Sequence, residues 1–217
     1  PLGEKLRMRV FGGYGEYQAS DVGASFLNFA GTTRNVGGEL AFEVYNRDRL
    51  WIDAIGGFRY DKFEVDRGAP GTPKSGLGEF ATPFFGVRSE RIGDASNLNG
   101  SVSVEFAQGI DALILDPGDS TPDLTGLGRL NPDESWTALK WDLGSSFYVE
   151  PLLHRSGFDS VSGGSEATLA HELFFNFRGQ YADNHRLVPN AEGLLGGFST
   201  VRGYPESALA GDTVIVF

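Results

Sequence analysis

The sequence has 217 residues, enough for one or two domains with a sizeable core, and a formal net charge of −11. Its 31 glycines, 12% aromatic residues and absence of cysteine exclude a disordered tail, a disulfide scaffold, a thiolate metal site and a cysteine nucleophile. A net negative charge is the wrong sign for a phosphate-binding surface, so we expect no nucleic-acid partner.

No uninterrupted apolar run approaches the ~18 residues that a membrane-spanning helix needs, which argues against a helical membrane protein. Apolar residues instead recur at every second position, the period of a strand with one apolar face. In chain order this alternation predicts eight strands, over residues 6–14, 38–45, 50–61, 82–90, 100–106, 137–150, 169–178 and 213–217. The polar turn 46–49 predicts a hairpin between the second and third strands, and no helix is expected.

The predicted connections alternate in length. Short ones lie near 46–49 and 92–97, and long ones rich in Gly, Pro and Asp lie near 21–35, 66–78, 108–134 and 182–212. Only the connection near 151–166 is longer than this rule predicts. Aromatic residues lie toward the strand ends, where an outer-membrane barrel has its girdles: Tyr14, Tyr45, Tyr60, Trp141 and Tyr181. The layout favours a transmembrane β-barrel, and a soluble antiparallel barrel or sandwich is the alternative.

The faces opposite the apolar ones carry charges in mid-strand, and these are candidate lumen charges. They are Glu39, Glu43, Asp53, Arg59, Arg88, Glu105, Lys140, Asp142, Glu172 and Arg178. A pore selective for one ion sign would use a ring of one charge, whereas a lumen of mixed sign can bind an inserted polar segment through complementary pairs.

The sequence gives no support for catalysis or for a bound cofactor. His154, His171 and His185 lack metal-site spacing, and no nucleotide-binding or nucleophile motif is complete. Glu39 and Glu43 are separated by roughly 13 Å along a strand, too far for a glycosidase pair. A loop with Asp116, Asp119 and Asp123 could offer oxygen ligands to calcium, but its spacing fits a solvated loop better. We therefore expect no enzyme activity, metal or cofactor.

Residues 187–212 read LVPNAEGLLGGFSTVRGYPESALAGD and carry the most specific motif. The motif consists of Val201, Arg202, Gly203 and Tyr204, with Gly196 and Gly197 before it and Gly211 and Asp212 after it. This segment resembles the long sixth extracellular loop of the two-partner secretion transporters, the haemolysin activation/secretion family. That family lies within a superfamily of outer-membrane insertion and secretion barrels that share a V-R-G-Y/F motif. The stretch WDLGSSFYVEPLL at 141–153 looks like the same barrel.

The resemblance implies a 16-stranded antiparallel transmembrane barrel preceded by periplasmic POTRA domains that capture an unfolded exoprotein. In the family the long loop folds into the lumen, where its arginine pairs with an acidic residue of the wall. Arg202 would be that anchor, and Tyr204 would pack the loop tip. Counting strands against the family, residues 1–217 are an all-β partial barrel domain of about eight strands. The loop near 182–212 belongs to it, while the POTRA domains and the remaining strands are absent.

The function expected from the resemblance is an outer-membrane translocation pore of a Gram-negative-type bacterium. Its partners would be an unfolded exoprotein and outer-membrane lipid, with no small-molecule cofactor. Two alternatives stay open: a barrel of the same superfamily that inserts other outer-membrane proteins, and a passive porin or small structural barrel closing at Phe217.

Overall fold

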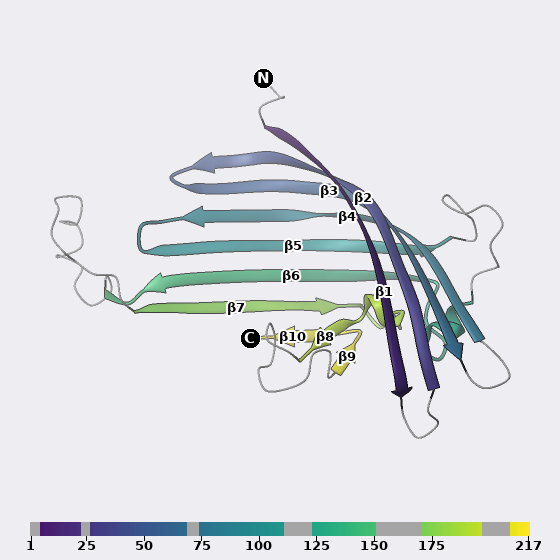
Figure 1. The fold of residues 1–217 in the computed structure, drawn as a ribbon. Helices are drawn as coiled ribbons and strands as arrows, with labels where there is room; N and C mark the ends of the chain where they lie inside the picture. Colours follow the sequence, from purple (N-terminus) through teal and green to yellow (C-terminus); the bar gives the residue numbers. More distant parts are fainter. Residues whose placement is uncertain (1–4, 23–26, 69–73, 111–122, 151–170, 197–208) are drawn as a thin grey trace.

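The computed structural model describes residues 5–22, 27–68, 74–110, 123–150, 171–196 and 209–217. These residues form one eight-stranded antiparallel sheet in the order β1-β2-β3-β4-β5-β6-β7-β10, and a separate two-stranded hairpin, β8-β9 (Figure 1). The sheet strands are β1 (Leu6–Val22), β2 (Leu27–Arg47), β3 (Leu50–Gly68), β4 (Lys74–Ile92), β5 (Ser96–Gly109), β6 (Ser135–Tyr148), β7 (Glu172–Tyr181) and β10 (Val214–Val216). The hairpin consists of β8 (Gly193–Leu195) and β9 (Leu209–Gly211). The predicted all-β class with eight antiparallel strands is confirmed.

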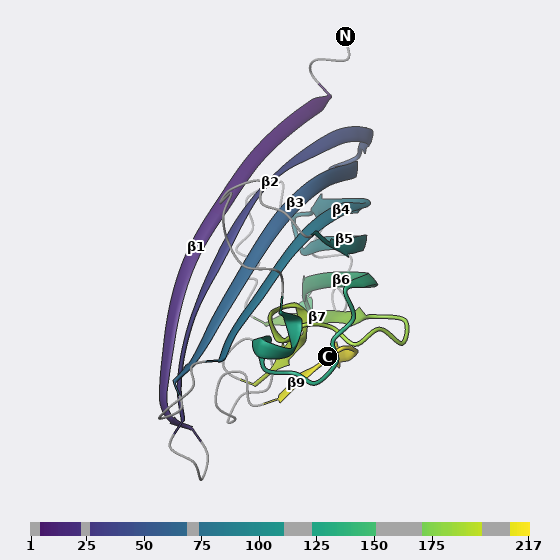
Figure 2. The same cartoon turned by 90° about the vertical axis from the view of Figure 1, so that its right-hand side faces the viewer.

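The described sheet is strongly curved and open. From β1 to β7, each strand pairs with the strand that follows it in the sequence. The two edge strands are β1 and β10. Figure 2 shows the sheet as an arc, with β9 and the 3₁₀ turn η2 (Leu124–Leu127) inside the curve. A second 3₁₀ turn, η4 (Pro189–Ala191), precedes β8.

The turn between β2 and β3 explains how the chain reverses after only two residues. Asp48 and Arg49 both have positive φ, 54° and 64°. Two successive positive φ angles characterise the tight hairpin turn whose twist matches that of the strands. The predicted hairpin turn is therefore confirmed.

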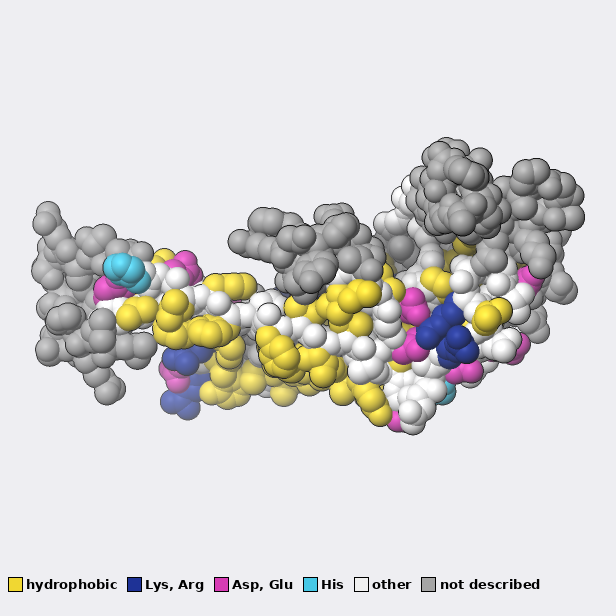
Figure 3. Space-filling view, turned by 90° about the horizontal axis from the view of Figure 1, so that it is seen from below, with side chains coloured by type: hydrophobic (Ala, Val, Ile, Leu, Met, Phe, Trp, Pro, Cys, Tyr) yellow, Lys and Arg dark blue, Asp and Glu magenta, His cyan; other side chains and the backbone are white. Residues whose placement is uncertain are grey.

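The convex face of the sheet is apolar from edge to edge. One row of directly paired residues crosses all eight strands: Leu6, Phe42, Ala54, Val87, Val102, Trp141, Gly179 and Ile215. Many side chains on this face are exposed, including Leu40 at 49% and Phe85 at 56%. Figure 3 shows hydrophobic side chains gathered along the middle of the molecule, with charged ones toward both ends.

The concave face is polar because successive strand residues point to opposite sides. Its central row pairs Glu43, Asp53, Arg88, Ser101, Asp142 and Arg178 across β2 to β7. The next rows contain Glu39, Glu105 and Lys140. Glu39, Asp53 and Glu105 are each less than 9% exposed. The polarity is thus the reverse of that of a soluble sheet, which buries its apolar side.

The apolar band ends along one row of paired residues on the convex face. Val36 and Tyr60 pair within the last apolar row, and the next row toward the long connections pairs Tyr14, Arg34, Lys62 and Glu79. Lys62 is buried there and contacts Glu64 at 3.0 Å. Tyr14 and Tyr60 therefore mark the border of the apolar band, although β1 and β3 continue beyond them.

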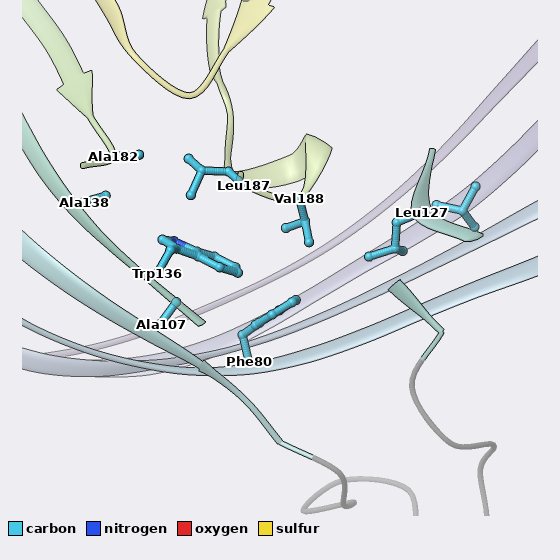
Figure 4. Packing of buried hydrophobic residues seen from close by; sticks show 9 residues of the cluster. Phe80, Ala107, Leu127, Trp136, Ala138, Ala182, Leu187 and Val188 are labelled. Carbon is cyan, nitrogen blue, oxygen red and sulfur yellow. The ribbon is translucent and has the colours of Figure 1, made fainter. Parts of the chain in front are cut away.

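An apolar cluster occupies the hollow of the sheet at the end with the long connections. It comprises Val65, Phe80, Ala107, Leu127, Trp136, Ala138, Ala182, Leu187 and Val188 (Figure 4). Gly78 has the side chains of Leu124 and Leu127 within 3.0 Å of the position of an added Cβ, so η2 seats closely on β4. This cluster was not predicted from the sequence, and it closes part of the concave face against solvent.

Two sequence-based expectations need correction. The connections predicted near 21–35 and 66–78 are wrong in extent, because β2 begins at Leu27, β3 reaches Gly68 and β4 begins at Lys74. These stretches are polar but remain paired with their neighbours. Trp141, Tyr14 and Tyr60 do not lie toward strand ends, since Trp141 sits in the central apolar row of β6 and β1 and β3 extend well beyond the two tyrosines. The described elements include two short 3₁₀ turns and no α-helix, which agrees with the expectation of no helix.

Candidate functional site on the concave face

The start of the connection between β7 and β10 lies against the concave face. Segment Pro189–Glu192 and Leu194 face Thr33, Asn35, Arg59, Asp61, Lys140 and Gln180 across a cavity of about 890 Å³. Leu194 and Gly193 also line a second cavity of about 380 Å³ with Arg178 and Asp142. Part of the predicted lumen loop therefore folds into the hollow of the sheet.

Apolar contacts hold one side of this segment. Leu187 and Val188 are fully buried and belong to the cluster with Phe80 and Trp136 (Figure 4). The rings of Phe80 and Trp136 are 4.6 Å apart, at an angle of 56°. Burying a Leu or Val side chain contributes about 1.5–3 kcal/mol. Leu187 and Val188 therefore contribute substantially to holding this segment against the sheet.

A polar clamp holds the other side, and its centre is Arg129. The guanidinium ion-pairs with Asp212 through both Nη atoms, with Nη2 2.7 Å from Oδ2, and Nη1 lies 2.5 Å from Oε1 of Glu192. Nη1 also donates to the Leu187 carbonyl at 2.9 Å, while the Leu187 N–H donates to Oδ1 of Asp212 at 2.9 Å. Gln180 on β7 donates to the carbonyls of Ala191 and Asp212.

The two carboxylates of the clamp are in different electrostatic environments. The hydrogen bonds from Arg129 hold the pKa of Asp212 below its usual range, and the N–H of Leu187 acts in the same direction. Burial raises the pKa of Glu192, and the neighbouring Asp212 adds to that rise. Arg129 therefore favours the charged form of Asp212, whereas the protonated form of Glu192 is favoured by burial.

One charge network on the wall joins β3, β5 and β6. Arg59 donates to Asp61 at 2.7 Å and pairs with Glu105 at 3.3 Å, and Lys140 lies 2.9 Å from the same Glu105. Glu105 thus receives two cations, which balances the cost of burying its charge.

A second network joins β1, β2, β3 and β4 through Glu39 and Asp53. Glu39 accepts from Arg88 at 3.2 Å and from Arg9 at 3.5 Å, and Arg7 ion-pairs with Asp53. Both buried carboxylates therefore have a cation from another strand. The register of the sheet brings together charges that are about 30 to 50 residues apart in sequence.

The remaining candidate lumen charges lie outside these networks. Glu43 accepts from Asn46 at 3.2 Å, Asp142 accepts from Asn176 at 3.3 Å, and Glu172 is exposed. Arg178 forms no ion pair with any described residue, and its Nη2 is buried without a hydrogen-bond partner. Among the candidate cations, Arg178 is thus the one without an ion-pair partner in the described part of the chain.

The central motif itself, Val201, Arg202, Gly203 and Tyr204, lies outside the described residues, as does Gly197. Its flanks are placed: Gly196 has φ 112°, a conformation that favours glycine, and Gly211 ends β9 beside the clamp. Of the predicted site residues, Asp212 is brought into the clamp. Arg129 and Glu192 were missed, because irregular segments give no periodic pattern.

The residues weighed as metal ligands are dispersed. His171 contacts Glu150 at 2.7 Å, His185 lies 3.5 Å from Asp133, and Asp123 caps η2 by accepting from the N–H groups of Thr125 and Gly126. His154, Asp116 and Asp119 lie outside the described residues. No group of three or more potential metal-ligating side chains gathers within the described ranges.

Neither the protein-family models nor the curated proteins that were compared with the sequence gave a match. Where the structure describes the chain, no helix has the length and hydropathy to cross a membrane.

Proposed function

We propose that residues 1–217 belong to an outer-membrane β-barrel that passes an unfolded exoprotein across the membrane, as a two-partner secretion transporter does. The observation that carries the proposal is the inverted polarity of the sheet. A central row of eight paired residues is apolar on the exposed convex face, and the matching concave row is charged. A lipid-facing surface and a polar lumen require this arrangement.

The width of the apolar band fits this reading. On β2 the outward positions from Val36 to Val44 are apolar or glycine. Nine residues match the ~9–11 residues that a tilted transmembrane β-strand needs to cross the hydrocarbon core. The tyrosines at the border supply the amphipathic rings expected there.

Translocation rather than passive diffusion is favoured by the contents of the hollow. Segment Leu187–Leu195 and its clamp occupy space that an open diffusion pore would leave to water. The wall charges are mostly paired with each other, so the lumen is not a ring of one sign. This combination, together with the V-R-G-Y motif, supports a protein-conducting barrel of that superfamily.

The test is a deletion of the gene in its native host, complemented by the full-length protein or by its Arg202→Ala variant. The secreted proteins and the outer-membrane proteins are then quantified side by side by mass spectrometry. We expect one secreted protein to disappear on deletion, to return with the wild type, and to stay reduced with R202A at unchanged membrane abundance.

Other outcomes would replace the proposal. A general loss of outer-membrane proteins would favour an insertion barrel of the same superfamily. An unchanged secretome together with steady ion conductance of the purified protein would favour a porin.

A further inference from the structure

One residue from a different connection holds both ends of the connection between β7 and β10. Arg129 follows η2, between β5 and β6. It contacts Leu187 and Glu192 near the start of the β7–β10 connection and Asp212 at its end. The contacts span 58 residues of sequence to Leu187 and 83 to Asp212. Two separate connections are thus tied together at one guanidinium.

The geometry of the clamp requires an arginine. Two Nη atoms meet the two oxygens of Asp212, which is the fork-shaped pairing that a lysine ammonium cannot form. The Leu187 backbone completes a ring, since its N–H donates to Asp212 and its carbonyl accepts from Arg129. The side chain of Arg129 is only 22% exposed, and that of Glu192 only 13%.

We propose that Arg129 is a positioning residue that keeps segment Pro189–Leu195 against the concave wall. Without the Arg129 guanidinium, Asp212 would keep the hydrogen bond from the Leu187 N–H, but Asp212 and Glu192 would be two neighbouring carboxylates with no cation in the clamp. Their repulsion and hydration would drive the ends of the connection away from each other and from the wall. The anchor acts at the base of the connection and is separate from the anchoring at the tip expected of Arg202.

The position of the segment can be measured directly by cysteine labelling. The 217 residues contain no cysteine, so Leu194→Cys in the full-length protein can be compared with the unsubstituted protein as background. Leu194 is 51% exposed within the hollow. The rate at which a membrane-impermeant maleimide labels L194C reports how the segment is held.

We expect Arg129→Gln to change this labelling rate about fivefold or more, which corresponds to about 1 kcal/mol. Arg129→Lys should give an intermediate rate, because it keeps the charge but not the fork. The matched control is Arg49→Gln, which breaks an ion pair with Asp94 at 2.5 Å that also joins two turns, but at the opposite end of the sheet. It should leave the rate unchanged.

An unchanged rate in correctly assembled R129Q would overturn the anchor. Assembly is checked by the shift in gel migration that folded barrels show on heating. If R129Q does not accumulate, Asp212→Asn takes its place, and the same unchanged rate would overturn the proposal. In addition, the effects of R129Q and D212N on the labelling rate of L194C should not be additive in the double variant, because each substitution breaks the same ion pair.

That Arg129 contributes to transport rests on the proposed function. Measuring secretion in addition to labelling separates the anchoring role of Arg129 from its role in transport. Secretion by R129Q is measured in the same cells. Altered labelling with reduced secretion supports both ideas. Altered labelling with unchanged secretion leaves the anchor in place and overturns its part in transport.

Discussion

At the scale of single residues, the charges on the concave wall differ in what balances them. Glu105 has Arg59 and Lys140, and Glu39 has Arg88, whereas Arg178 has no ion-pair partner among the described residues. On the proposed function, we therefore predict that Arg178→Gln shifts the reversal potential of the purified full-length protein in a salt gradient toward cation selectivity. Arg47→Gln removes the same charge from a side chain that is 76% exposed at the end of β2, and it serves as the control. Equal shifts in both variants would show that Arg178 does not line the ion path.

The clamp also makes a prediction about pH. Because the pKa of Asp212 is lowered in the folded protein, its ion pair stabilises the fold above the unfolded pKa and is lost as the pH falls through the lower, folded value. Glu192 acts oppositely, since its raised pKa favours the folded protein as it becomes protonated. Asp212→Asn should lower stability by about 1–2 kcal/mol at pH 7, and this difference should shrink below about pH 4. The thermal midpoint of the gel-migration shift is measured for the wild type and for D212N at pH 7 and below about pH 4. If the two proteins differ by the same amount at both pH values, Asp212 does not stabilise the fold through a charged clamp.

The members of the site were predictable one at a time, but their contacts were not. Alternation placed Glu39, Arg88 and Glu105 on one face, and the structure places them there. Which carboxylate meets which cation depends on strand register, which a single sequence does not specify for polar positions. Arg129 lies in a segment without periodicity, and only the folded chain brings it to Asp212.

At the scale of elements, the two faces of each strand should respond differently to the same substitution. Val102 lies in the central apolar row and is 42% exposed, and its neighbour Ser101 lies between Arg88 and Asp142 on the concave face. If the convex face contacts lipid, Val102→Lys should cost about 2–4 kcal/mol, the value for a charge at the membrane midplane. Ser101→Lys should cost less than 1 kcal/mol, because it adds a cation to a mixed, hydrated wall. Urea unfolding of the full-length protein in lipid vesicles compares the two, and equal losses would contradict a lipid-facing convex surface.

The lengths of the strands show where sequence patterns stop being informative. The apolar positions of β2 end near Val36, yet the strand begins at Leu27. Beyond the apolar band the convex positions become polar, as at Arg34 and Lys62, while Val65 and Phe80 are apolar on the concave face. No single apolar face therefore runs along the whole strand for alternation to reveal. Pairing continues there because β1, β3 and β4 extend equally far, and each strand satisfies the backbone groups of the next.

At the scale of the whole molecule, if residues 1–217 belong to a larger barrel as proposed, the open edges of the described sheet decide whether these residues alone can form a stable membrane species. The described sheet ends at β1, a strand of 17 residues that pairs on one side only, and at β10. In lipid every unpaired N–H and C=O costs several kcal/mol, so only a closed sheet is stable there. Residues 1–217 expressed alone should therefore fail to give a heat-modifiable, protease-resistant species in lipid vesicles, whereas the full-length protein should give one. A protease-resistant species formed by residues 1–217 alone would contradict this prediction. Its mass in native mass spectrometry would then distinguish closure by one chain, with β1 paired to β10, from closure by two copies that supply each other's missing edge.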